Sequence, residues 1–207
     1  METIVTATQE LNKLFDEFNK TKFNNELEKP IIIIQSDRRG KVYGWCTLEK
    51  VWENDGSERY EIAIAAEFLN RTYEETCSTM LHEMIHLYNV IREVKDCSNN
   101  GYYHNKKFKE TAEQFGLIVE KSDKYGWGHT KLNQQNIDLV NSFDIDKEVF
   151  KLYRKLKLKE PTEKTPTYIY TCEKCEVKFS LKKDLSLNCG LCNKPFNKEE
   201  KGGEADG

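Results

Sequence analysis

His82-Glu83-Met84-Ile85-His86 is the stretch from which the organisation of this chain can be worked out. On an α-helix, side chains four residues apart lie one above the other, so His82 and His86 would share one face. Two imidazoles at this spacing can reach a single Zn²⁺ ion. Glu83 would project beside them, where its carboxylate can accept a proton from water. The pentapeptide therefore predicts a metal site suited to hydrolysis of an amide bond.

The residues around the pentapeptide predict a long, central helix over residues 72–94. Thr72 is a suitable N-cap, and Glu75 three residues later completes a capping box. The apolar positions cover a broad face, which is typical of a helix that is largely buried. These positions are Met80, Leu81, Met84, Ile85, Tyr88 and Ile91. Unpaired imidazoles would be costly to bury in such a helix, which favours a metal partner for them.

A catalytic zinc site needs three protein ligands and one open position, so a third ligand must come from elsewhere. His104 and His129 are the other histidines of the chain, and Glu93 is a further conceivable ligand. We prefer His104, because it follows a polar loop over residues 96–101 and begins the next predicted helix. Glu93 lies two helical turns after His86, so it would need a bend to reach the same metal.

Hydrolysis would also need a base and a group that stabilises the developing oxyanion. Glu83 is the predicted base, which would take a proton from water and pass it to the leaving amine. The sequence does not choose among the candidate oxyanion stabilisers, which are Tyr102, Tyr103, Arg92 and His129.

The order of predicted elements is helix, strands, then helices, which indicates an α+β domain over residues 1–157. An apolar stripe of Leu11, Leu14, Phe15 and Phe18 predicts a first helix over residues 8–24. Strands are predicted over residues 31–35, 42–48, 60–64 and 117–120, with a hairpin turn at Asn54-Asp55-Gly56. Further helices are predicted over residues 105–115, 134–142 and 147–157, and residues 126–128 are expected to be irregular.

Four cysteines near the C-terminus form the pattern C-x₂-C-x₁₃-C-x₂-C, namely Cys172, Cys175, Cys189 and Cys192. Two such knuckles supply four thiolates to a tetrahedral Zn²⁺, which predicts a structural zinc ribbon over residues 168–196. With four positions filled, this metal would hold the fold and do no chemistry. Apolar residues of the ribbon would pack around it, or with nearby lysines contact single-stranded nucleic acid. They are Tyr170, Phe179, Leu187 and Phe196.

The remaining segments and cysteines complete the predicted organisation. Residues 158–167 contain two prolines among charged residues and are expected to be a linker, and residues 197–207 are expected to be disordered. Cys46, Cys77 and Cys97 are scattered, so we expect them to be reduced and buried or partly buried.

Composition limits the classes of protein to which this chain can belong. Its 207 residues carry a formal net charge of −3, so no overall basic field favours nucleic-acid binding. A basic run over residues 147–159 predicts a solvated helix face, with phosphate contact as the alternative. No apolar run is long enough for a bilayer, and the N-terminus does not resemble a signal peptide. We therefore expect no membrane partner and a cytoplasmic location.

Several stretches together resemble the SprT-like family of zinc metallopeptidases, which is Spartan-related. They are Phe23-Asn24-Asn25-Glu26-Leu27, Tyr43-Gly44-Trp45-Cys46, Glu61-Ile62-Ala63-Ile64, the helix from Thr79 to His86, His104 with Phe108, and the start of the cysteine module at Tyr170-Thr171-Cys172. The resemblance implies a zincin-like fold, with His82, His86 and His104 on zinc and Glu83 as the base. It also implies a role on proteins bound or crosslinked to DNA.

Two function hypotheses follow. The first is a zinc-dependent endopeptidase that acts on protein substrates, with one catalytic and one structural Zn²⁺ and with single-stranded DNA as a further partner. The alternative is a catalytically silent adaptor that binds nucleic acid or protein through the zinc ribbon. Glu83 favours the first, since a metal scaffold alone has no need of that carboxylate.

Overall fold

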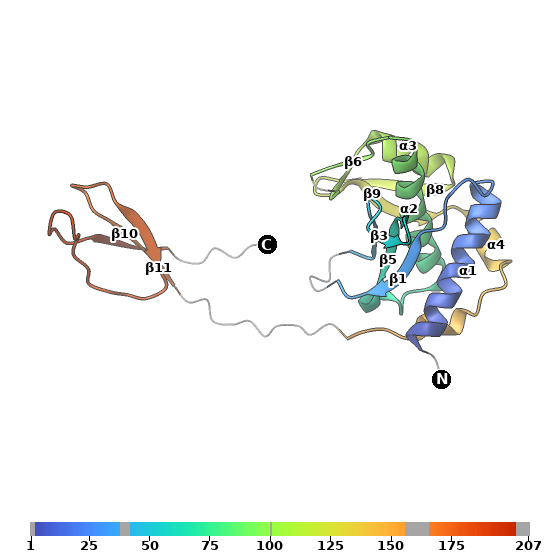
Figure 1. The fold of residues 1–207 in the computed structure, drawn as a ribbon, viewed down its shortest axis with the longest axis horizontal. Helices are drawn as coiled ribbons and strands as arrows, with labels where there is room; N and C mark the ends of the chain where they lie inside the picture. Colours follow the sequence, from blue (N-terminus) through green and yellow to red (C-terminus); the bar gives the residue numbers. More distant parts are fainter. Residues whose placement is uncertain (1–2, 38–41, 100, 156–165, 202–207) are drawn as a thin grey trace. The chain divides into compact units, whose positions relative to one another are not determined.

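The computed structural model describes residues 3–37, 42–99, 101–155 and 166–201 (Figure 1). It divides into two compact units, Met1–Leu156 and Lys157–Gly207, which are described separately below. The first unit mixes helices with short sheets, which confirms the predicted α+β class. Its elements are α1 Ile4–Lys22, β1 Ile31–Gln35, β2 Gly44–Cys46, β3 Trp52–Asn54, β4 Ser57–Arg59, β5 Glu61–Ala65, η1 Ala66–Phe68, α2 Tyr73–Ile91, β6 Cys97–Ser98, β7 Tyr103–His104, α3 Lys106–Gln114, β8 Leu117–Ser122, β9 Gly126–Leu132, α4 Gln134–Asn141 and η2 Lys147–Lys151.

A three-stranded sheet in the order β1-β5-β2 lies beside α1 and α2 (Figure 1). β1 and β5 are parallel, with Ile32 opposite Ile62, whereas β2 is antiparallel to β5, with Trp45 opposite Ala63. β5 is the central strand and is almost entirely buried, which explains its run of small and branched apolar residues. β2 therefore forms one edge of this sheet.

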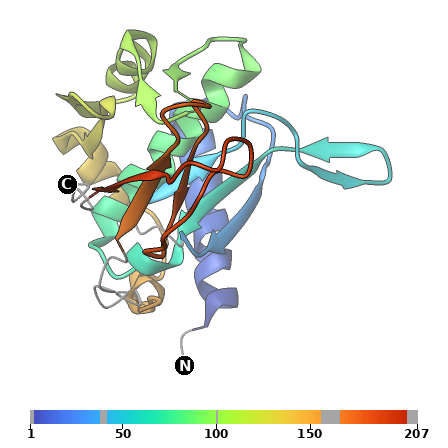
Figure 2. The same ribbon diagram turned by 90° about the vertical axis from the view of Figure 1, so that its left-hand side faces the viewer.

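The hairpin predicted at Asn54-Asp55-Gly56 is confirmed as the turn between β3 and β4. Asp55 and Gly56 both have positive φ values, of 49° and 78°, as a tight two-residue hairpin turn requires. The two strands extend away from the remainder of the first unit (Figure 2), and all of their residues are exposed.

α2 is the central helix of the first unit, as its broad apolar face predicts. The predicted capping box is present, because the Thr72 hydroxyl accepts from the Glu75 N–H while the Glu75 carboxylate accepts from the Thr72 N–H. Nearly every α2 residue from Tyr73 to Leu87 is buried. The helix packs against α1, the first sheet and β9, so it connects the parts of the core that these elements contribute.

A second sheet in the order β6-β7-β9-β8 contacts α2 through β9. The expectation that residues 126–128 are irregular is wrong in kind, because they begin β9, where Gly126 pairs with both β7 and β8; the register with β8 shifts between this pair and the next. Gly126 and Gly128 suggested a loop, but here they allow a strand to approach its neighbours closely. Likewise, part of the expected polar loop over residues 96–101 forms β6, which pairs with β7.

The helix predicted over residues 147–157 is also wrong in kind and extent. Lys147–Lys151 form a short 3₁₀ helix, and Leu152 is already extended. The Arg154 N–H then donates to the Ala66 carbonyl at 2.9 Å, which draws the chain into an extended path. Of the basic run, Lys151 pairs with Glu148 and Arg154 pairs with Glu67, so these cations have partners within the protein.

Large apolar side chains from both sheets and all four helices form one continuous core. The α1 stripe is confirmed, since Leu11, Leu14, Phe15 and Phe18 are fully buried. Cys77 and Cys97 are buried, Cys46 is partly buried, and all three are free thiols, as predicted. None of the helices among the described residues is both long enough and apolar enough to span a bilayer.

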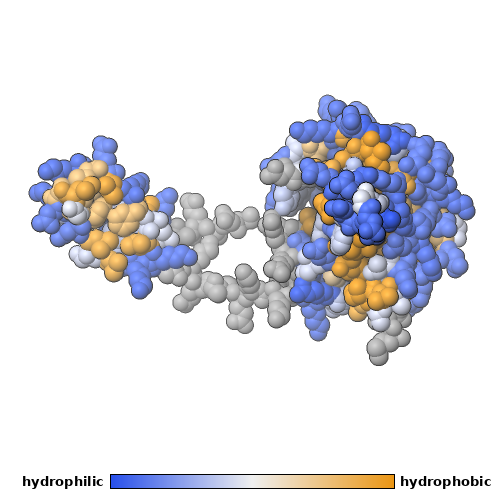
Figure 3. Space-filling model, viewed as in Figure 1, coloured by the Kyte–Doolittle hydropathy of each residue, from blue (hydrophilic) through white to orange (hydrophobic). Residues whose placement is uncertain are grey.

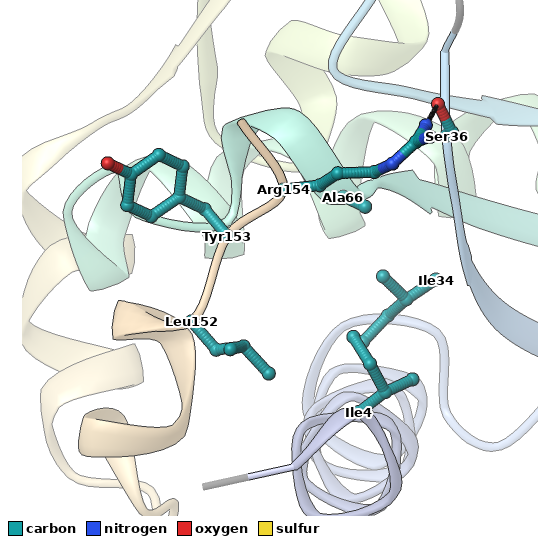
Figure 4. A pocket seen from close by; sticks show the side chains of 7 residues that line it. All are labelled: Ile4, Ile34, Ser36, Ala66, Leu152, Tyr153 and Arg154. Carbon is teal, nitrogen blue, oxygen red and sulfur yellow. Dashed lines mark hydrogen bonds between the residues drawn. The ribbon is translucent and has the colours of Figure 1, made fainter. Parts of the chain in front are cut away.

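A hollow of about 440 Å³ opens at one end of the first unit, beside the first turn of α1 (Figure 4). It is lined by Ile4, Ile34, Ser36, Ala66, Leu152, Tyr153 and Arg154. None of these residues belongs to the predicted metal site, so this hollow is separate from the predicted active site.

The second unit is a three-stranded antiparallel sheet in the order β11-β10-β12. Its strands are β10 Thr167–Thr171, β11 Lys178–Leu181 and β12 Asn197–Lys201. The disorder expected from residue 197 is contradicted as far as Lys201, because β12 pairs with β10 along its whole length. Residues 158–165 of the predicted linker and residues 202–207 of the predicted tail lie outside the described residues. Apolar side chains gather on the face of this unit seen in Figure 3.

Candidate metal centre and cysteine cluster

The imidazoles of His82, His86 and His104 converge on one point. Their Nε2 atoms are 3.0 Å apart between His82 and His104, 3.2 Å between His82 and His86, and 3.1 Å between His86 and His104. α2 supplies the first two rings from successive turns, and β7 supplies the third. The spacing is close to what three corners of a tetrahedral zinc site with N ligands at about 2.0–2.1 Å would require.

The Nδ1 atom of each imidazole has a hydrogen-bond partner on the side of the ring away from the three Nε2 atoms. His86 Nδ1 lies 2.8 Å from Asp96 Oδ2, His82 Nδ1 lies 3.0 Å from Thr130 Oγ1, and His104 Nδ1 lies 3.3 Å from the Tyr125 carbonyl. A carboxylate and a carbonyl only accept hydrogen bonds, so they place the proton on Nδ1 of His86 and His104. The Thr130 hydroxyl can accept from His82 in the same way.

This tautomer leaves three Nε2 lone pairs directed at one another, which is unfavourable unless a cation lies between them. Burial and the neighbouring His86 lower the pKa of His104 to about 4, and burial lowers the pKa of His82 well below its usual value. Both rings therefore favour the neutral form that binds metals. For His86, the hydrogen bond and charge of Asp96 outweigh burial and raise its pKa. The donor set fits a divalent metal ion.

Phe108 on α3 supports all three rings at once. Its ring centroid lies 4.6 Å from that of His82, 4.7 Å from that of His86 and 4.6 Å from that of His104. Phe108 is fully buried, so it forms an apolar floor that limits movement of the imidazoles. The spacing of His104 and Phe108 in the sequence thus has a structural reason.

Glu83 lies on the same helix, beneath the edge strand β2. Its side chain is 5% exposed, and burial raises its pKa to about 7, against the lowering effects of His86 and the Cys46 N–H. A Cβ on Gly44 would meet the Glu83 Cγ at 3.3 Å, so the glycine lets β2 pass directly over the carboxylate. A base with a pKa near neutrality is well matched to proton transfer in water.

β9 shapes the wall behind His104 by means of two glycines. A Cβ on Gly128 would lie 2.7 Å from His104 Nδ1, and one on Gly126 would lie 2.1 Å from the His104 carbonyl oxygen. Thr130, two residues further along the same strand face, contacts His82. The alternating pattern Gly126, Gly128, Thr130 is the sequence signal that could have revealed β9 as part of the site.

Replacing Gly126 by Ala is expected to destabilise the first unit by about 2–5 kcal/mol. The residue has φ 61°, where a Cβ costs about 1–2 kcal/mol, and the clash with His104 adds an overpacking cost of about 1–3 kcal/mol. Gly56→Ala is the matched control, because Gly56 has φ +78° but no atom near the added Cβ. Urea unfolding should show the larger loss for Gly126→Ala, and equal losses would contradict the proposed close approach.

The other candidate ligands are placed away from the three imidazoles. His129 is exposed and lies on the opposite face of β9 from Gly128 and Thr130, facing Glu120 across the pair with β8. Glu93 is exposed and follows the end of α2 in a left-handed conformation with φ 57°. Neither residue belongs to the converging set, which the structure forms from His82, His86 and the preferred third ligand, His104.

Among the candidate oxyanion stabilisers, Arg92 is already engaged elsewhere. It pairs with the Glu26 carboxylate, and its guanidinium lies 3.6 Å above the centroid of the Tyr88 ring. Tyr103, in β7 next to His104, packs its ring against the Gly126 position. Tyr102 is 43% exposed. Both tyrosines come directly before His104 in the sequence, and Tyr103 shares β7 with it.

The four C-terminal cysteines form a second cluster, within the second unit. The Sγ atoms of Cys172, Cys175, Cys189 and Cys192 all lie within 4.8 Å of one another, and those of Cys172 and Cys192 are 3.6 Å apart. All four are free thiols, and this spacing suits thiolates around one tetrahedral metal at about 2.3 Å. The cluster is compatible with the predicted zinc ribbon.

Two equivalent turns build this cluster. The Glu176 N–H donates to the Cys172 carbonyl and the Asn193 N–H donates to the Cys189 carbonyl, and both Glu176 and Asn193 have φ 55°. Backbone N–H groups of Leu191 and Cys192 lower the pKa of Cys189 to about 7, which favours the thiolate. The second turn thus presents a sulfur ligand together with backbone donors.

The aromatic rings of the ribbon pack on one another. Tyr170 is 1% exposed and stacks on Phe179 at 5.4 Å, while Phe179 meets Phe196 edge-on at 5.1 Å. The Tyr170 hydroxyl also accepts from the Leu185 N–H and donates to the Lys183 carbonyl. These contacts favour the packing role over a stacking platform for bases.

The sequence profile of the SprT-like family matches residues 11–126, which is more than half of the chain. The chain belongs to the SprT-like family. No curated protein and no solved structure matches it. The SprT-like match runs from α1 to the first residue of β9, so it includes the three converging histidines and Glu83. It ends before Thr130 and before the cysteine cluster.

Proposed function

We propose that this SprT-like protein is a zinc-dependent endopeptidase that hydrolyses peptide bonds of protein substrates. The observation that carries the proposal is the convergence of three Nε2 atoms on one face of α2, with Glu83 buried beside them. We also propose that the domain is zincin-like, since a metal-binding helix packed under a sheet with an exposed edge supports that fold. The catalytic ion would lie at the histidines and a structural zinc at the cysteines.

In this proposal, His82, His86 and His104 hold the metal and Glu83 handles the proton. A zinc ion held there would act as a Lewis acid toward the scissile carbonyl and help water to ionise. Glu83 would take the proton from the attacking water and deliver it to the leaving amine. The hydrogen bonds behind the imidazoles would keep their Nε2 atoms directed at the metal throughout.

The edge strand β2 is the proposed binding place for an extended substrate segment. Within the described residues, β2 pairs with a strand on one side only, and it runs above Glu83. A peptide that added to this edge would use backbone hydrogen bonds, so it would be accepted with little regard to most of its side chains. Its scissile bond would then lie beside the carboxylate and the three imidazoles.

We further propose that the substrates are proteins bound or crosslinked to DNA, with single-stranded DNA as the favoured partner. The family resemblance supports this role, as do the lysines of the ribbon, which are Lys174, Lys178, Lys182 and Lys183. Such contacts with phosphates would weaken steeply as salt is added. The packed aromatic rings make charge, rather than base stacking, the expected source of affinity.

The proposal is tested by cleavage of casein and of a DNA-binding protein, by wild type and by Glu83→Gln, with and without single-stranded DNA. Glu83→Gln keeps the shape of the side chain but removes the base, so the cleavage rate should fall by about 10²–10⁴. Zinc content, measured by elemental analysis, should not change. Exposed Glu120→Gln is a matched control and should cleave like wild type.

Three results would each count against a part of the proposal. Cleavage by Glu83→Gln at the wild-type rate would remove Glu83 from the chemistry. Equal, negligible cleavage by both proteins under every condition would favour the adaptor function instead. Activity that is independent of DNA at all salt concentrations would contradict the proposal of DNA-linked substrates, but not the proposal that the protein is an endopeptidase.

A further inference from the structure

Asp96 connects the metal centre to the segment that follows α2. Its carboxylate is 4% exposed, and Oδ2 takes the His86 Nδ1–H at 2.8 Å and the Asn89 Nδ2–H at 2.9 Å. Burying a carboxylate is costly unless strong hydrogen-bond donors surround it. The His86 and Asn89 donors therefore stabilise the Asp96 carboxylate in this buried place. Neither composition nor spacing had indicated a role for Asp96.

The donor Asn89 is itself held in one orientation. The Thr111 hydroxyl donates to Asn89 Oδ1 at 3.1 Å, which turns the amide nitrogen of Asn89 toward Asp96. Asn89 is 1% exposed, so its amide is shielded from solvent. A series of hydrogen bonds therefore connects α3 to the imidazole of His86, through Thr111, Asn89 and Asp96.

The backbone of Asp96 is tied to the third imidazole as well. The Asn105 N–H donates to the Asp96 carbonyl at 2.9 Å, and Cys97 pairs with His104 across β6 and β7. The β6–β7 hairpin thus places the Asp96 carboxylate against His86 Nδ1 and also directs His104 toward the other two imidazoles. Correct placement of Asp96 should therefore favour correct placement of His104.

We propose that Asp96 is a positioning residue that fixes the Nδ1–H tautomer of His86 and so maintains metal binding at the three histidines. This inference rests on the metal centre of the proposed function, but metal binding can be measured whether or not the protein cleaves peptides. Loss of an outer partner of this kind typically weakens metal affinity by about 10–100-fold.

The test is zinc affinity in competition with a chromophoric chelator, for the full chain carrying Asp96→Asn or Asp96→Ala. Asp96→Asn keeps the size and one acceptor, so the histidine site should weaken about 10-fold, and Asp96→Ala should weaken it up to about 100-fold. The cysteine cluster in the same chain is an internal reference and should bind as in wild type. Asn89→Ala removes the other donor but leaves the His86 contact, so its loss of affinity should be smaller.

Imidazole ¹⁵N NMR of the metal-free protein provides a second readout that a merely structural role would not change. His86 should carry its proton on Nδ1 in wild type and in Asn89→Ala, and should lose this preference in Asp96→Ala. Wild-type zinc affinity in both Asp96 variants would overturn the proposal. An unchanged His86 tautomer in Asp96→Ala would overturn it too, whatever the effect on stability.

Discussion

His104→Ala is expected to lose the zinc proposed at the histidines together with the proposed peptidase activity, whereas His129→Ala should keep the zinc and the activity. His104 Nε2 completes the triangle with His82 and His86, while His129 faces away from it on β9. Loss of a residue that only hydrogen-bonds to a metal ligand weakens metal affinity by up to about 100-fold, and loss of the ligand itself should weaken zinc affinity by more. Zinc content after dialysis against a weak chelator, measured by elemental analysis, gives the result directly.

These two variants form a matched pair, since each removes one imidazole from adjacent strands of the same sheet, β7 and β9. Far-ultraviolet circular dichroism should show that both remain folded, because the core does not depend on either ring. The assignment of the third ligand would be wrong if His129→Ala, and not His104→Ala, released the metal.

Removal of the cysteine-bound metal is expected to unfold the second unit and leave the first unit folded. The ribbon has few fully buried apolar residues, among which Tyr170 is the large one, so its fold should depend on the metal. Structural zinc in small domains is associated with an apparent binding free energy of about 10–16 kcal/mol at neutral pH. A strong chelator, or Cys189→Ser, should therefore remove protection from hydrogen exchange in β10, β11 and β12.

The first unit provides the control in the same experiment. Its core of buried side chains is continuous across α1, α2 and both sheets, so its central amides should stay protected without either metal. Cys77→Ser changes a cysteine outside the cluster and should leave the ribbon protected. Persistence of ribbon protection after complete removal of zinc would show that its aromatic packing is sufficient for folding.

Much of the fold could be predicted because the patterns are local. The capping box at Thr72, the α1 stripe and the hairpin turn at Gly56 each depend on residues within a few positions of one another. The errors arose where strand pairing decides. Residues 126–128 were expected to be irregular because of their two glycines, and the tail beyond residue 196 was expected to be disordered because it is polar. Residues 126–128 instead begin a strand that forms a hairpin with β8 and meets β7 at Gly126, and residues 197–201 pair with β10, which is far away in sequence.

The sequence by itself indicated which residues would carry the proposed chemistry. The helical spacing of His82 and His86, the carboxylate of Glu83 and the paired cysteine knuckles follow from chain geometry and ligand preference alone. Only the tertiary structure decided between His104 and His129, because strand pairing sets which ring faces α2. It also revealed Asp96 and Thr130, whose roles exist only once separate segments meet, since a hydrogen bond between remote residues has no local pattern that predicts it.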